Sequence, residues 1–218
     1  MFRNLKILAL AGMAMAALGA FGASGAKAAE FHCSAEPCRY TLKPDGTGKT
    51  AHHVFRVKNS IGESFVFTCD QLTGEATTAT KSVTTLTFTG GFGFGCTGLG
   101  SAAASRMNGC DFLYGATGTL SIKGCGGIEF EAGGCVLKIF EQGPLGGVAF
   151  HNIGEEGSTT TEMTAEVSGL SLAISLSGGV KCGIDTTKTP ITGEYQTGNV
   201  IITGETDPSG VMANAWWT

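Results

Sequence analysis

Residues 85–91 read Thr85-Leu86-Thr87-Phe88-Thr89-Gly90-Gly91, a strict alternation of hydroxyl and apolar side chains that stops at two glycines. Successive side chains of a β-strand point to opposite faces, so this pattern predicts a strand with one buried and one solvated face. Threonine suits the solvated face because a β-branched side chain fits a pleated surface. The stretch is typical of an antiparallel sheet.

The same alternation recurs along the chain and ends each time at a glycine or a polar turn. It occurs in residues 119–123, 128–131, 137–139, 170–176 and 200–203. Turn signals roughly every 8 to 15 residues are typical of an antiparallel β-sandwich, or a sandwich/barrel-like arrangement. No alternation of strands and helices is visible, which disfavours the parallel α/β classes. We expect an all-β, disulfide-stabilised fold with little helix, the one helical candidate being the alanine-rich stretch Ser101–Met107.

The first 28 residues have the features of an export signal. Arg3 and Lys6 precede an apolar run over residues 7–21, and Ala26-Lys27-Ala28 matches the A-x-A pattern of signal-peptidase cleavage. The apolar run is shorter than the roughly 20 residues of a membrane-spanning helix. The sequence therefore predicts a signal peptide over residues 1–28, a secreted or cell-surface protein, and no membrane span after cleavage.

The rest of the chain, residues 29–218, is long enough to bury a core, and we expect one all-β domain with a candidate internal boundary at 143–147. Cleavage would remove three of the 14 basic residues, which leaves 11 against 18 acidic ones and a net charge of −7. The basic residues are scattered singly along the chain. Nucleic-acid binding needs clustered Lys and Arg, so we expect no nucleic-acid partner.

All eight cysteines lie after the predicted leader: Cys33, Cys38, Cys69, Cys96, Cys110, Cys125, Cys135 and Cys182. An even set in an exported chain predicts disulfides, which stabilise mainly by restricting the unfolded chain. The spacings lack the paired C-x2-C pattern of zinc sites. Eight cysteines allow about 105 complete pairings, so connectivity stays open. The most economical hypothesis joins Cys33 to Cys38, Cys69 to Cys96, Cys125 to Cys135 and Cys110 to Cys182.

Glu129 and Glu131 are the candidate catalytic pair. Two residues apart on a predicted strand, their side chains share a face at about 6.5 to 7 Å, within the range of carboxylate separations in glycosidases. They support an alternative hypothesis of a secreted polysaccharide-acting hydrolase. Glycosidases usually place their carboxylates on opposite sides of the scissile bond, so a solvated acidic face is the simpler interpretation.

Two further patterns favour no cofactor and no metal. Residues 93–98 match G-x-G-x-x-G, but a dinucleotide loop needs a following helix and an acidic residue on a second strand. A cysteine inside the loop and the short stretch after it indicate a glycine-rich turn instead. His32 would be the third residue if cleavage fell after Ala29, a copper(II)-chelating arrangement. Cleavage after Ala28 fits the leader better and removes that geometry.

Tyr195, Trp216 and Trp217 are the candidate binding residues, because exposed aromatic rings can stack on sugars. The two tryptophans are adjacent, so in a strand one would face the core and the other would face outward. The simpler interpretation is that they close the last strand against the rest of the sheet.

The chain also resembles a family of exported bacterial proteins without a known activity, which are Thr/Gly-rich and all-β. The resemblance lies in Met107-Asn108-Gly109-Cys110, Cys125, Cys135, Val180-Lys181-Cys182, and the stretches 192–195, 203–204 and 216–217. Cys33 and Cys38 are additions to that pattern. The resemblance implies an all-β fold and no catalytic residue.

Together these patterns favour a secreted or cell-surface structural or binding module, without enzymatic activity, whose partner is a glycan or a protein at the cell surface. The alternatives are the hydrolase with paired carboxylates and a subunit of an extracellular assembly joined through exposed strand edges. The sequence identifies neither the ligand nor the oligomeric state.

Overall fold

The computed structural model describes residues 28–44, 53–93, 95–154 and 162–218. Within these ranges the regular structure is almost wholly antiparallel β, and the one helical element is the short 3-10 turn η1 (Gly179–Cys182). The all-β prediction is confirmed. The predicted signal peptide lies outside the described residues except for Ala28. No helix among the described residues is long and apolar enough to cross a membrane.

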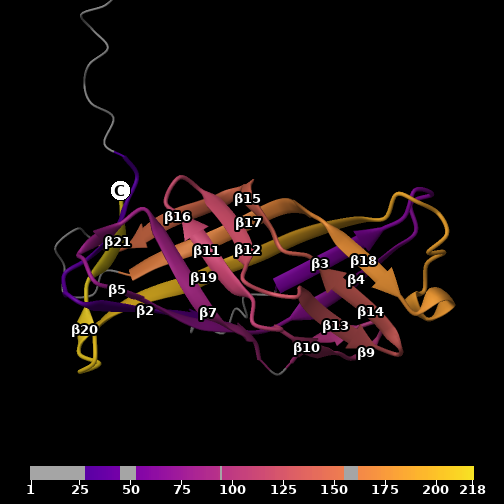
Figure 1. The fold of residues 1–218 in the computed structure, drawn as a ribbon, viewed down its shortest axis with the longest axis horizontal. Coiled ribbons are helices and arrows are strands. Elements are labelled where there is room, and N and C mark those ends of the chain that lie inside the picture. The colour runs from indigo at the N-terminus through magenta and orange to yellow at the C-terminus, as the bar shows by residue number, and fades with distance from the viewer. Residues whose placement is uncertain (1–27, 45–52, 94, 155–161) are drawn as a thin grey trace, which may run out of the picture.

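Among the described residues, the largest sheet contains fourteen strands. It is strongly curved and extends along the long axis of the molecule (Figure 1). Its main path runs in the order β15 (Gln142–Gly146), β12 (Thr119–Lys123), β11 (Asp111–Gly115), β7 (Thr85–Phe92), β5 (Leu72–Thr78), β2 (Cys38–Pro44), β19 (Thr192–Thr206), β3 (His53–Lys58), β4 (Ser64–Cys69), β8 (Thr97–Gly98) and β9 (Ser101–Ala102). Off this path, β17 (Glu162–Leu172) and β20 (Met212–Ala213) pair with β19, and β16 (Val148–Ile153) pairs with β17.

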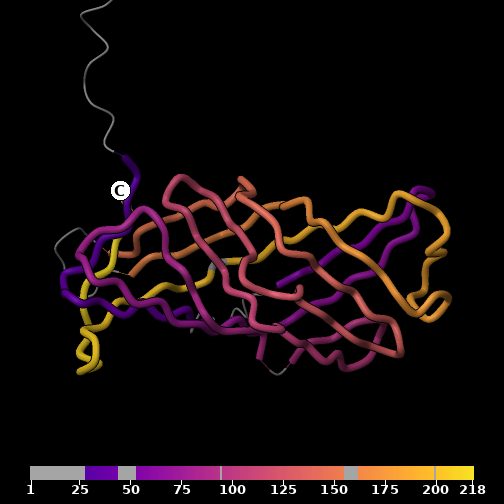
Figure 2. The backbone as a smooth tube through the Cα atoms, viewed as in Figure 1, coloured from indigo at the N-terminus to yellow at the C-terminus, as the bar shows by residue number. Residues whose placement is uncertain are grey.

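The 15-residue strand β19 joins two halves of the molecule, which we call the β2 half and the β3 half after the strands that pair with its two ends. Along one edge its first residues, 192–197, pair with β3, and its last residues, 200–206, pair with β2. Along the other edge it pairs with β17. Figure 2 shows this strand, near the yellow end of the colour range, running through much of the length of the molecule. One continuous backbone ladder therefore connects both halves.

Over the described ranges, the β2 half of the sheet curls strongly without closing into a barrel. β15 is one end of the main path and β16 ends the branch that leaves β19 through β17, yet Gly147 alone separates them in the chain. Val148 N–H donates to the Gly118 carbonyl at 3.2 Å, and Ser168 N–H donates to the Gly147 carbonyl at 3.2 Å. The inward faces of these strands enclose the core.

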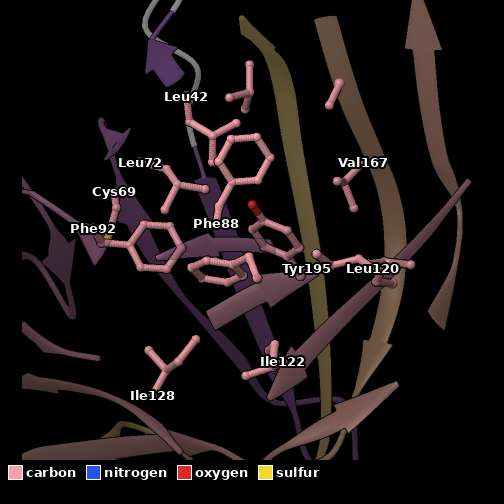
Figure 3. Close-up of a cluster of buried hydrophobic side chains, with 14 of the residues drawn as sticks. Leu42, Cys69, Leu72, Phe88, Phe92, Leu120, Ile122, Ile128, Val167 and Tyr195 are labelled. Carbon is pink, nitrogen blue, oxygen red and sulfur yellow. The ribbon is translucent and has the colours of Figure 1, made fainter. Parts of the chain in front are cut away.

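A second sheet packs over the β3 half in a sandwich-like arrangement. Its order is β10 (Ala104–Arg106), β13 (Ile128–Ala132), β14 (Cys135–Ile139) and β18 (Ile174–Ser177). The fully buried Phe130 of β13 lies with its ring centroid 4.7 Å from that of Phe55 and 5.8 Å from that of Phe67. Figure 3 shows Phe92 and Tyr195 in the buried cluster where the two halves meet. One apolar core therefore extends through both halves.

The structure corrects two expectations about secondary structure. Ser101–Met107 contains no helix; it forms β9 and β10, because β10 pairs with β13 and Ala103 N–H donates to the Cys96 carbonyl. Residues 170–176 do not form one strand. The chain leaves one sheet at Leu172 and enters the other at Ile174, and the amide of Gln142 bonds both backbone groups of Ala173 at this break.

All eight cysteines are paired. The predicted Cys33–Cys38 and Cys69–Cys96 bonds are confirmed, whereas the predicted Cys125–Cys135 and Cys110–Cys182 bonds are wrong. The chain instead joins Cys110 to Cys125 and Cys135 to Cys182. Strands β11 and β12 pair Asp111 with Lys123, so the residues just beyond both ends of that hairpin meet.

Candidate functional site

The described residues at the start and end of the chain lie side by side in a three-stranded sheet. It consists of β21 (Ala215–Trp217), β1 (Phe31–Cys33) and β6 (Ser82–Val83), with β1 in the centre. Glu30 and Thr218 exchange two backbone hydrogen bonds, of 3.2 and 3.0 Å, just beyond the paired strands. Figure 1 marks the C-terminus at this end of the molecule.

The inner face of this sheet is fixed to the core. Phe31 is fully buried and meets the ring of Phe150 edge-on, with centroids 5.0 Å apart. Trp217 packs against the same ring at 5.9 Å, and its indole N–H donates to the Ala116 carbonyl at 2.8 Å. Trp217 is therefore the anchor of β21.

A side chain closes the outer edge of β21. The amide of Asn152, on β16, donates to the Trp217 carbonyl and accepts from the Trp217 N–H, both at 2.8 Å. Asn152 thus makes the two hydrogen bonds that a neighbouring strand would make. The last strand is held on both sides, which limits its movement.

The outer face carries the other tryptophan. Trp216 is half-buried and pairs across the strands with His32, and the two rings stack at 5.3 Å with 14° between their planes. His32 Nε2 lies 3.0 Å from the Thr218 hydroxyl and 3.9 Å from the Glu30 carboxylate. We call Glu30, His32, Trp216 and Thr218 the terminal platform. It combines a flat aromatic surface with a carboxylate, an imidazole and a hydroxyl.

Tyr195 does not belong to this platform. It lies on β19 with 3% of its surface exposed, stacked on Phe55, and its hydroxyl is 2.8 Å from His53 Nδ1. Burial raises the pKa of this tyrosine well above its ordinary value. Of the three candidate binding residues, only Trp216 therefore offers a ring that is neither in the core nor bonded to it.

Glu129 and Glu131 share the outer face of β13, as their spacing predicts. Glu129 lies 3.5 Å from Lys138 Nζ on β14, and Glu131 lies 3.6 Å from Arg106 Nη2 on β10. The side chains are 26% and 46% exposed, respectively. The structure thus brings the two carboxylates together, and each has its own cation. The arrangement is that of an alternating charged row on an open sheet face.

The two remaining candidate motifs, the G-x-G-x-x-G match and His32, are parts of the structural framework of the fold. Cys96, inside the G-x-G-x-x-G match, is bonded to Cys69, and Thr97–Gly98 forms strand β8 where the sequence predicts a glycine-rich turn; Phe94 lies outside the described residues. Over the residues described, no group of three His, Cys, Asp or Glu could hold a metal ion. His32 lies in a strand paired on both sides.

No sequence pattern indicates that His32 and Trp216 stack. The two residues lie at opposite ends of the chain, and their contact depends on the register of β1 against β21.

Comparisons with protein-family models, with curated proteins and with solved structures find no match for the chain.

Proposed function

We propose that the protein is an exported, non-catalytic binding module that contacts a glycan through the terminal platform. The observation that carries the proposal is the division of roles between the two tryptophans. Trp217 is partly buried and held against the core by its ring and its indole N–H, whereas the ring of Trp216 lies on the outer face beside polar side chains.

The chemistry of the platform suits a sugar. A pyranose ring presents C–H groups on one face and hydroxyls around its rim, so it can stack on an indole and bond to polar groups nearby. Glu30, His32 and Thr218 supply a carboxylate, an imidazole nitrogen and a hydroxyl, His32 from β1 and the other two from just beyond the ends of β1 and β21. Binding sites typically combine an aromatic surface with a few polar groups of this kind.

The frame supports rigid presentation of these groups. The platform lies on paired strands that the Asn152 amide closes on one side and the Cys33–Cys38 bond ties to β2. A preorganised surface loses little conformational entropy on binding. Four disulfides also fit the oxidising environment outside the cytoplasm.

Substitution of Trp216 by alanine tests the proposal. We expect the wild-type protein to bind members of a glycan array and Trp216→Ala to bind them at least about tenfold more weakly, because a central aromatic contact carries a large share of binding energy. Phe140→Ala is the matched control, since Phe140 is also an exposed aromatic residue, 40% accessible, on another part of the surface. Its affinity should equal that of the wild type.

Two results would contradict the proposal: a wild-type protein that binds nothing on the array, or a Trp216→Ala variant with unchanged affinity. Intrinsic fluorescence can follow binding in both variants, because Trp217 remains as a reporter close to the site. Near-ultraviolet circular dichroism should show that each variant keeps its native packing.

The hydrolase hypothesis has weaker support. Glu129 and Glu131 do share a face, but each lies beside a cation on a neighbouring strand, whereas a glycosidase usually sets its two carboxylates on opposite sides of the scissile bond. The double substitution Glu129→Gln/Glu131→Gln would abolish any polysaccharide hydrolysis that depends on this pair.

A further inference from the structure

The outermost strand of the four-stranded sheet has one unpaired edge. β18 pairs with β14 through Ser175 opposite Lys138 and Ile174 opposite Ile139. Within the described part of the chain, no strand pairs with the other edge of β18 (Figure 1). An unpaired edge presents a row of backbone donors and acceptors to any strand that can approach it.

Three other sheet edges are closed or interrupted. The Asn152 amide bonds the edge of β21, and Pro144 lies within the end strand β15. In β10 the Ser105 hydroxyl donates to the Phe92 carbonyl, and Arg106 is exposed. These features are the usual protections of an edge strand: a covering side chain, a proline or a charge.

β18 carries none of these protections. Its sequence, Ile174-Ser175-Leu176-Ser177, has no proline and no charge. The two serines are exposed, and Ile174 and Leu176 are half-buried on the face that packs against the core. The edge is therefore neutral, and its two faces have opposite polarity.

We propose that β18 pairs antiparallel with β18 of a second copy of this chain, about a two-fold axis at Ser175. This register places Ser175 opposite its own copy and Ile174 opposite Leu176. Residues directly opposite each other in an antiparallel pair point to the same face of the sheet. In this register an outward-facing serine therefore meets a serine, and Ile174 on the core side meets Leu176 on the core side. The apolar rows join on the core side, and the hydroxyls join on the outer side.

The charges near this edge favour a second copy. The nearest charged cross-strand neighbour is Lys138, which already lies 3.5 Å from Glu129 within its own chain. Two copies would therefore meet without an unpaired like charge at the junction. Three paired residues from each copy bury less area than the roughly 1,200 Å² of a stable interface, so the association depends on concentration.

A charge placed at Ser175 tests the register. By sedimentation equilibrium at about 0.15 M salt, we expect the wild-type full chain to form dimers as its concentration rises. Ser175→Lys and Ser175→Glu should each remain monomeric, because like charges then lie directly opposite each other. An equimolar mixture of the two variants should regain dimers, since a lysine faces a glutamate. Thr87→Lys is the control, because Thr87 is exposed and its strand, β7, is paired with a strand on each side. This variant should dimerise as the wild type does.

The proposal is overturned if the wild type is monomeric at every concentration. It is also overturned if Ser175→Lys leaves the dimer unchanged, which would place the contact elsewhere, or if the mixture of variants stays monomeric. Ser175 is exposed, and near-ultraviolet circular dichroism of both variants separates a lost interface from a lost fold. Failure of glycan binding by Trp216→Ala has no bearing on this result.

Discussion

Gly90 and Gly74 lie directly opposite each other where β7 pairs with β5. A Cβ at Gly90 would come within 2.1 Å of the Thr73 carbonyl oxygen and 2.4 Å of the Gly74 Cα. Both are backbone atoms of a paired strand, so neither can move aside without disrupting the ladder. Glycine at position 90 is required for the close approach of the two strands and does more than end the alternating stretch before it.

We therefore expect Gly90→Ala to lower the free energy of unfolding by about 1 to 3 kcal/mol, the usual cost of overpacking. Urea denaturation followed by circular dichroism measures the change. Gly146→Ala is the control, because a Cβ there meets no atom within 4 Å. It should change stability by less than about 0.5 kcal/mol. Equal stability of the two variants would show that β5 and β7 can separate at little cost.

The hairpin of β11 and β12 explains why the predicted disulfide pairing failed in its second half. Proximity along the chain favoured Cys125 with Cys135, but the two cysteines flank different ends of β13. The register of Asp111 with Lys123 brings Cys110 to Cys125, and η1 carries Cys182 to the start of β14. The hairpin register was accessible from the alternating pattern, whereas the position of η1 depended on distant contacts.

The loops closed by these two bonds differ in length, so their removal should differ in cost. The Cys110–Cys125 bond spans 15 residues, and the Cys135–Cys182 bond spans 47. On the chain-entropy account, the double change to alanine should cost about 3 kcal/mol for the first bond and about 4 kcal/mol for the second. Denaturant unfolding of both variants, with the other three bonds intact, measures the difference. A larger cost for the shorter loop would contradict this account.

Local patterns located strands better than they identified strand partners. The alternating stretches beginning at Leu86, Leu120, Ile128 and Leu137 all lie in strands of the structure. The alanine-rich stretch at 101–107 is the one helical candidate in the sequence, and alanine favours helices, yet pairing with β13 overrides that preference. The break at Ala173 was invisible in the sequence, because alternation continues unchanged from one sheet into the other.

All three tyrosines of the chain, Tyr40, Tyr114 and Tyr195, are buried in the core that both halves share. Burial raises the pKa of each above the ordinary value of about 10, because an ionised phenol would lose its hydration. The unfolded chain ionises first, so this contribution to stability is complete below about pH 10 and declines above it. The slope reaches about 1.4 kcal/mol per pH unit for each tyrosine.

A spectrophotometric titration should therefore show no phenolate signal from the native protein near pH 10. We expect all three tyrosines to ionise together at higher pH, in the same step in which the near-ultraviolet circular dichroism signal is lost. A tyrosine that titrates with a midpoint near 10 while the dichroism stays native would show that part of the core is open to solvent.

The amino-acid sequence alone was enough to predict the all-β class, the positions of several strands and the use of cysteines in disulfides. The fold class and these strands follow from alternation and glycine placement within a few residues, and the disulfides follow from the even number of cysteines in the whole chain. Strand partners, two of the four disulfides, the stacking of His32 on Trp216 and the unpaired edge of β18 emerged only in the folded molecule. They depend on the register between distant strands, and an alternating strand can satisfy its period of two against many different neighbours.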